Sequence, residues 1–104
     1  MSDKIVVHVD IDLEDIAPIF LNNKKKDIGK IYDALEQGDF NTIQVLGHRM
    51  KGAGGGYGFD EITRIGGLME TAAKQQLTDQ IRSLTAELDS YLERVEPVYE
   101  EMPE

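Results

Sequence analysis

The stretch LTDQIRSLTAELDSYLERVEPVY, residues 77–99, has the most regular pattern in the chain and decides the fold. Its apolar side chains recur at intervals of three and four residues: Leu77, Ile81, Leu84, Leu88, Tyr91, Leu92, Val95 and Tyr99. This spacing places them along one side of an α-helix, as in helices that pack together in a bundle. Thr78 or Asp79 is expected to cap the start of the helix, and Pro97 to kink or end it. The acidic tail over residues 93–104 is then the solvated end of this helix.

Three earlier segments also carry apolar residues at helical spacing. They cover residues 13–35, about 40–54 and about 59–73. In the first segment Pro18 fits a first helical turn, so the helix is expected to begin, or to kink, near Asp15. Asn22-Asn23 leaves open a break that would separate a short additional N-terminal helix from the next one.

The connections between these helices are short. Gly38 is suited to ending one helix and Asp39 to capping the next, and the glycine-rich residues 54–58 indicate a tight connection. Four helices joined by short loops favour antiparallel neighbours. The sequence therefore predicts an all-α domain over residues 13–104, an antiparallel up-down four-helix bundle.

Residues 1–12 do not share the helical pattern. They contain the β-branched residues Ile5, Val6, Val7, Val9 and Ile11, which indicate an extended N-terminal arm or a short edge strand. His8 lies in this arm and has no potential metal-binding neighbour with which to form a site.

Composition excludes several classes of function. With 104 residues the chain is long enough for one core and too short for two. A net charge of −9 argues against binding nucleic acid, because there is no basic face to neutralise phosphates. There are no cysteines for disulfides or thiolate metal sites. No apolar run approaches a membrane span and the N-terminus lacks a signal-peptide pattern, so a soluble cytoplasmic domain without membrane contact is expected.

His48 lies on the face that the helical pattern does not bury. The apolar stripe of its helix consists of Phe40, Ile43, Leu46, Met50 and Ala53. At 100° per residue, His48 stands about 170–180° from the centre of this stripe, and Lys51 shares its face, one turn on and about 60° around. Gly52 is one turn above His48, although Gly within a helix costs about 1 kcal/mol relative to Ala. A partner that approaches His48 closely would explain the bare backbone at Gly52.

The sequence argues against three kinds of chemical site. A carboxylate-bridged metal bundle needs Glu-x-x-His pairs, but Val45 stands three residues before His48. A phosphate-binding P-loop places Lys after its glycines, whereas Lys51 precedes the glycine cluster. No Ser has a base and an orienting acid at informative spacing. An exposed His can still accept a phosphoryl group, and a cation one turn away would hold the phosphoryl oxygens.

Three blocks of the chain resemble the histidine-containing phosphotransfer (HPt) domain family. They are GHRMKG at residues 47–52, GGGYGF at residues 54–59, and Ile65-Gly66 followed by LMETAA at residues 68–73. The family pattern is a His, a Lys three residues later and a Gly after it, then a Gly opening the next helix and a Leu-Glu step. The resemblance covers roughly residues 12–100. It departs from the family where Met69 stands between Leu68 and Glu70.

The resemblance implies a module of a two-component phosphorelay. His48 would take a phosphoryl group on Nε2 from the phospho-Asp of one response-regulator receiver domain and pass it to another. Lys51 would stabilise the phosphoryl oxygens, and Gly52 would leave room for the docking receiver. The domain would need no cofactor of its own, because the Mg²⁺ belongs to the receiver. It would be a phosphoryl carrier, without autonomous kinase activity, and a hybrid sensor kinase is a further candidate partner.

Three neighbours of His48 complete the candidate site. Gln44, one turn before His48 and about 40° away, could hydrogen-bond the ring or a phosphoryl oxygen. Arg49 lies about 100° around the helix, which favours a solvated charge or a contact at the rim of a partner over a phosphate ligand. Val45 could join an apolar docking patch or lie at the edge of the core.

Two other functions stay open. The bundle could be an adaptor that binds receivers without carrying phosphate. It could also be the His-bearing substrate domain of a chemotaxis-type kinase, whose ATP-binding domain would lie elsewhere on a larger polypeptide. The sequence identifies neither donor nor acceptor.

Overall fold

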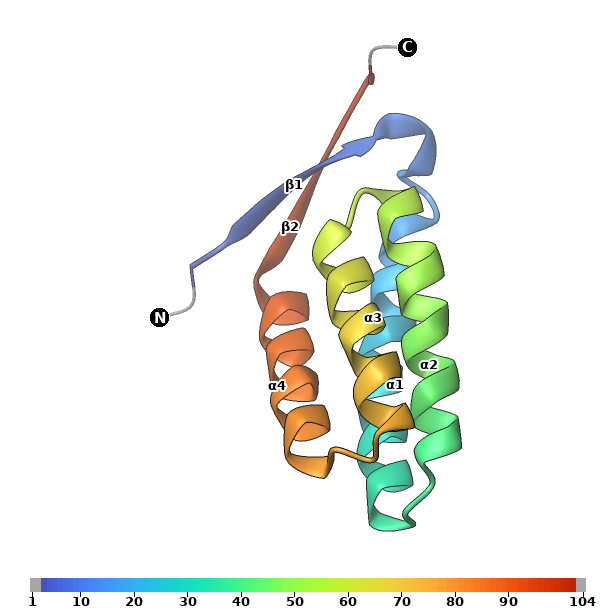
Figure 1. The fold of residues 1–104 in the computed structure, drawn as a ribbon. Coiled ribbons are helices and arrows are strands. Elements are labelled where there is room, and N and C mark those ends of the chain that lie inside the picture. The colour runs from blue at the N-terminus through green and yellow to red at the C-terminus, as the bar shows by residue number, and fades with distance from the viewer. Residues whose placement is uncertain (1–2, 103–104) are drawn as a thin grey trace.

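The computed structural model describes residues 3–102 and is mostly helical. Its helices are α1 (Ala17–Glu36), α2 (Phe40–Ala53), α3 (Asp60–Lys74) and α4 (Thr78–Arg94). Its other elements are the 3-10 turns η1 (Ile11–Leu13) and η2 (Gly54–Tyr57) and the strands β1 (Ile5–Asp10) and β2 (Val95–Glu100). The chain descends along α1, ascends along α2, descends along α3 and ascends along α4, so the four helices stand side by side (Figure 1).

The first helix is continuous, and the break that the sequence left open at Asn22-Asn23 is absent. Both Asn side chains are exposed, while the buried stripe continues past them from Phe20 to Ile31. Because an exposed Asn lowers helix stability only slightly, the apolar stripe keeps the chain helical through these two residues. The helix begins at Ala17, with Pro18 in its first turn. A separate short turn does precede α1: it is η1, where the Asp10 carboxylate accepts a hydrogen bond from the Asp12 backbone N at 2.9 Å.

The helix that carries His48 begins where the sequence predicted. Gly38 has a φ of +67°, a left-handed conformation in which a side chain is unfavourable. The Asp39 carboxylate then caps α2, accepting hydrogen bonds from the Thr42 backbone N at 3.1 Å and from Thr42 Oγ1 at 2.6 Å. The caps predicted for α4 are wrong: its N-cap is Leu77, which makes no side-chain capping hydrogen bond.

The C-terminal stretch corrects the all-α prediction. Helix α4 stops at Arg94, and β2 pairs in parallel with β1, from Ile5 beside Val95 to Asp10 beside Glu100. Burial along β2 alternates with a period of two, as in a strand with one covered face. Pro97 has no N–H for helical hydrogen bonding, so the helix ends before it. Residues 95–100 are therefore not the solvated helix end expected over 93–104, and residues 5–10 are a paired strand. Residues 1, 2, 103 and 104 of these predicted segments lie outside the described residues.

Helices α2 and α3 are packed backbone against backbone. A Cβ built on Gly47 of α2 would lie 2.7 Å from the backbone N of Glu70, and one on Gly66 of α3 would lie 2.5 Å from the backbone N of Lys51. Any larger residue would hold these helices apart. The core of the bundle contains the side chains with no exposed surface, which include Val9, Ile31, Ile43, Met50, Phe59, Ile62, Ile65, Met69, Ile81 and Leu88. The close contact brings α3 next to His48.

Candidate functional site

His48 projects from the middle of α2 into solvent. Its side chain is 72% exposed, whereas Ile43, Leu46 and Met50 of the same helix are buried in the core. The helical wheel predicted this division, because His48 is opposite the apolar stripe. The imidazole can therefore be reached by a partner without any rearrangement of the bundle.

The ring is held from α3 by Glu70. His48 Nδ1 lies 2.8 Å from Glu70 Oε2, and the Glu70 side chain is only 13% exposed. An ionised carboxylate can only accept hydrogen bonds, so the proton of this bond is carried by Nδ1. In the neutral ring the lone pair then lies on Nε2. Glu70 thus fixes both the orientation of the ring and the nitrogen that is available as a nucleophile.

Glu70 is suited to this role by its charge state. Burial acts to raise the pKa of its carboxyl group, but the hydrogen bond from His48 and the nearby charges of His48, Lys74 and Lys51 outweigh burial. The net result is a pKa of Glu70 below its ordinary value. Glu70 is therefore ionised at neutral pH.

Lys51 also contacts Glu70. Its Nζ lies 3.7 Å from Glu70 Oε1, so one carboxylate contacts the ammonium group through one oxygen and the imidazole through the other. The Lys51 stem runs over Gly67 of α3, where its Cδ would be 3.7 Å from an added Cβ. The arrangement keeps the ammonium group on the same face as His48.

Beside His48 is a shallow hollow of about 370 Å³. It is lined by Gln44, Val45, His48, Arg49 and Glu70. Arg49 thus borders the same hollow as the imidazole, despite the 100° that separates them on the helical wheel. Gln44 also lines this hollow, but within residues 3–102 the imidazole is hydrogen-bonded to Glu70 and not to Gln44. Val45 is exposed at the rim.

The surface above His48 is bare. Gly52 is exposed, and a Cβ built on it would meet no atom within 4 Å. Packing within the domain therefore does not require glycine at this position, whereas it leaves no room for a side chain at Gly47 or Gly66.

The sequence interpretation missed Glu70 as a site residue. The resemblance included Glu70 only as part of a Leu-Glu step, and the wheel of one helix cannot show what a neighbouring helix supplies. The signal that could have found it is the pair of glycines, Gly47 and Gly66, which permits α3 to approach α2 closely enough for Glu70 to reach His48.

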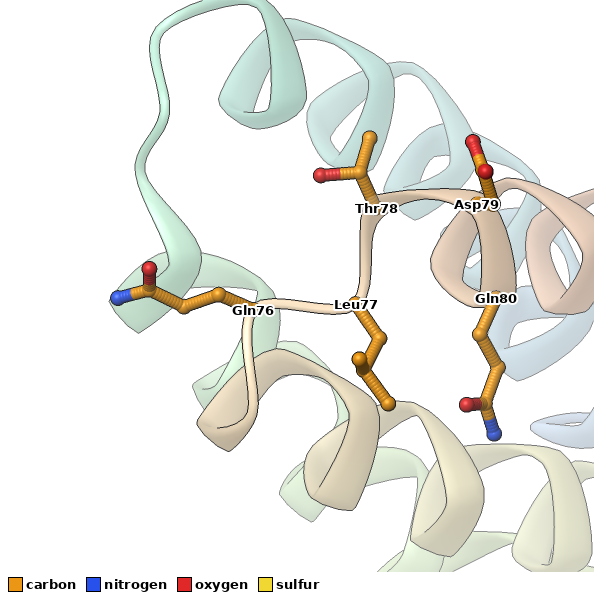
Figure 2. Close-up of a pocket in the computed structure, with 5 residues that line it drawn as sticks. All are labelled: Gln76, Leu77, Thr78, Asp79 and Gln80. Carbon is orange, nitrogen blue, oxygen red and sulfur yellow. The ribbon is translucent and has the colours of Figure 1, made fainter.

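A larger hollow, of about 490 Å³, lies where α3 connects to α4. Its lining consists of the consecutive residues Gln76, Leu77, Thr78, Asp79 and Gln80. Their side chains do not converge: Leu77 and Gln80 point to one side of the chain, and Thr78 and Asp79 to the other (Figure 2). Without convergent polar groups this hollow is not suited to binding a ligand.

Two kinds of feature are absent from the described part of the chain. Within residues 3–102 there is no group of three or more His, Cys, Asp or Glu side chains placed to hold a metal ion. None of the helices in this range has the length and apolarity needed to cross a membrane.

Comparisons with known proteins assign the chain to a family. Neither the curated proteins nor the solved structures contain a match. The family model of the Hpt domain, however, matches residues 15–97. Since this range is most of the chain, the protein belongs to the Hpt domain family, whose members perform histidine phosphotransfer in two-component signalling.

Proposed function

We propose that His48 is the phosphoacceptor of this domain, which takes a phosphoryl group from the phospho-Asp of one receiver domain and transfers it to another. The observation that carries the proposal is the exposed imidazole whose Nδ1 is bonded to Glu70 at 2.8 Å. Hpt domains typically interact with response-regulator receivers in phosphorelays, which supports this class of partner.

The reaction is a displacement at phosphorus. The Nε2 lone pair attacks the phosphorus of the acyl phosphate, the bond from phosphorus to the Asp oxygen breaks, and the carboxylate leaves. The ring now carries a phosphoryl group on Nε2 and a proton on Nδ1. Glu70 accepts the hydrogen bond from Nδ1 throughout, which stabilises the positive charge that develops on the ring. In the second transfer a receiver carboxylate attacks phosphorus and the bond to Nε2 breaks.

Lys51 stabilises the phosphoryl oxygens during transfer. Its Nζ is on the face of His48 and contacts Glu70 only at 3.7 Å, so it can turn towards an incoming anion. Gln44 lines the hollow beside the ring and can donate a hydrogen bond to the same phosphoryl group. The Mg²⁺ that such a transfer uses is supplied by the receiver.

The receiver docks over the exposed face of α2. The open backbone of Gly52 leaves space above the ring, and Val45 offers an exposed apolar contact. Arg49 borders the hollow beside His48 and can pair with an acidic residue of the partner. A hybrid sensor kinase is a candidate donor, and with such partners the domain is expected in the cytoplasm. The domain is a carrier and is expected to have no kinase activity by itself.

The test uses receiver domains charged with a small phosphodonor. Wild-type protein and the variants His48→Gln and His8→Gln are incubated with the charged receiver, and transferred label is measured. His8 is a matched control because it is the other histidine of the chain and lies in β1, outside the site.

We expect the wild type and His8→Gln to be labelled equally and His48→Gln to remain unlabelled, with an unchanged melting temperature because the site is exposed. Binding of the receiver without labelling of the wild type would indicate the adaptor function instead. Labelling that requires an ATP-binding kinase domain would favour the substrate domain of a chemotaxis-type kinase.

A further inference from the structure

The crossing of α2 and α3 is formed by two glycines that contact each other's helix backbones. A Cβ on Gly47 would lie 2.8 Å from the carbonyl oxygen of Gly66, and a Cβ on Gly66 would lie 2.7 Å from the carbonyl oxygen of Gly47. These neighbours are backbone atoms, which cannot move aside as the end of a flexible side chain can. The separation of the two helices is therefore determined at this crossing.

His48, Lys51 and Glu70 all extend from the crossing. His48 follows Gly47 directly, and Lys51 is one turn beyond Gly47 on the same helix. Glu70 is one turn beyond Gly66 on α3. Each glycine also touches the backbone of a site residue across the crossing, since Gly47 faces Glu70 and Gly66 faces Lys51.

We propose that Gly47 and Gly66 are positioning residues for phosphotransfer, because their lack of side chains holds α3 at the one separation from which Glu70 reaches His48. The proposal rests on His48 being the phosphoacceptor. Neither glycine contacts the phosphoryl group or the Nε2 atom that it joins. Both act through the hydrogen bond between His48 and Glu70.

The expected displacement follows from the distances. An ordinary contact of a Cβ is 3.4–4 Å, whereas the added Cβ would lie 2.7 Å from its nearest atom at Gly47 and 2.5 Å at Gly66. The helices must therefore separate by roughly 1 Å at the crossing, the scale of an overpacked core. The same displacement would stretch the Nδ1–Oε2 distance of 2.8 Å to about 3.5 Å or more, beyond a normal hydrogen bond. A misplacement of about 1 Å can lower a reaction rate about 10²-fold.

The experiment compares Gly47→Ala and Gly66→Ala with Gly29→Ala. Gly29 is a matched control because it lies in α1 and a Cβ there meets nothing within 4 Å. The first measurement is the ¹⁵N NMR spectrum of the His48 ring, which reports the Nδ1–H bonded to Glu70 and needs no receiver. The second is single-turnover transfer from one charged receiver, resolved into receiver affinity and the rate of the transfer step.

We expect Gly47→Ala and Gly66→Ala to lose the bonded Nδ1–H signal and to transfer about 10- to 100-fold more slowly, with receiver affinity within about two-fold of wild type. Gly29→Ala should match the wild type in both measurements. A purely structural role would lower the melting temperature without changing the ring spectrum of the folded protein.

The proposal is overturned if Gly47→Ala and Gly66→Ala are folded and show the wild-type spectrum of the His48 ring. It is also overturned if the hydrogen bond between His48 and Glu70 is lost in these variants but the transfer rate is unchanged. If both glycine variants unfold, Glu70→Asp provides the test. This substitution moves the carboxylate away from His48 by one methylene and leaves Gly47 and Gly66 unchanged. Slow transfer by Glu70→Asp supports the proposal, and wild-type transfer overturns it. A wild-type protein with the bonded Nδ1–H signal that accepts no phosphoryl group refutes the proposed function itself.

Discussion

Replacement of Gly52 should change stability and phosphotransfer in opposite directions. An added Cβ meets no atom within 4 Å, so Gly52→Ala introduces no clash in the free domain. Gly in a helix is less favourable than Ala by roughly 0.5–1 kcal/mol, chiefly because Gly loses more backbone conformational entropy than Ala when the chain folds. Gly52 is the residue before the last of α2, where a helix can fray, so the gain should not exceed the upper end of this range. It corresponds to a rise in melting temperature of about 2–6 °C.

A longer side chain at the same position tests docking. Gly52→Gln should fold at least as well as the wild type, since Gln has a good helix propensity and the position is open. Its side chain stands one turn above His48, in the space through which a receiver must approach. We therefore expect transfer from a charged receiver to fall by about ten-fold or more, through weaker receiver binding.

The assay pairs thermal melts of the Gly, Ala and Gln forms with transfer rates from one charged receiver. Wild-type transfer by the Gln form would refute the claim that docking needs the bare backbone. Strong destabilisation of both variants would show that Gly52 serves a helix contact or a backbone conformation instead.

Three further predictions concern other parts of the structure. Lys51→Ala should slow single-turnover transfer about ten-fold or more, because it removes an electrostatic stabiliser of the phosphoryl group. Arg49→Ala should slow transfer less. Equal rate losses in the two variants would contradict the role of Lys51. The hydrogen bonds from the Thr42 side chain and backbone lower the pKa of Asp39. This cap therefore stabilises the protein at pH values above the unfolded-state pKa of Asp39. The stabilisation is lost as the pH falls through the folded-state pKa. Thermal melts should accordingly show Asp39→Ala well below wild type at neutral pH and close to it in acid; a difference independent of pH would argue against the cap. Val9 is a fully buried residue of β1, so Val9→Ala should lower the free energy of unfolding by about 2 kcal/mol in a denaturant titration. Val6 of the same strand is 55% exposed, so Val6→Ala should stay within about 0.5 kcal/mol; equal values would contradict the packing of the strand pair on the bundle.

The helices could be predicted from the sequence because each depends on neighbours three and four residues away. The stripe of Ile43, Leu46 and Met50 was sufficient to place His48 on the solvent side of α2. Asp39 was recognisable as a cap because it acts on Thr42, only three residues along the chain.

The strand pair was missed because its two strands come from opposite ends of the chain. The β-branched residues of β1 indicated an extended segment, but nothing local identified a partner some ninety residues away. In β2, Val95 and Tyr99 are four residues apart and fit a helix as well as a strand. Their helical spacing continued the pattern of α4 and hid the change of period.

Glu70 was missed for a related reason. It is 22 residues from His48, and its contact depends on how far α3 is shifted and rotated against α2. That relation is determined by the contact at Gly47 and Gly66, a property of two helices together. Single-helix wheels therefore placed His48 and Lys51 on one face but could not show that one carboxylate links them.

The most direct test of the account is to identify the atom that carries the phosphoryl group. Protein labelled with ¹⁵N-histidine is phosphorylated by a charged receiver, and the coupling between ³¹P and ¹⁵N is measured by NMR. The account predicts one phosphorylated nitrogen, Nε2 of His48, with Nδ1 still protonated and bonded to Glu70. Phosphorus on Nδ1 of His48, on His8 or on no histidine would contradict it.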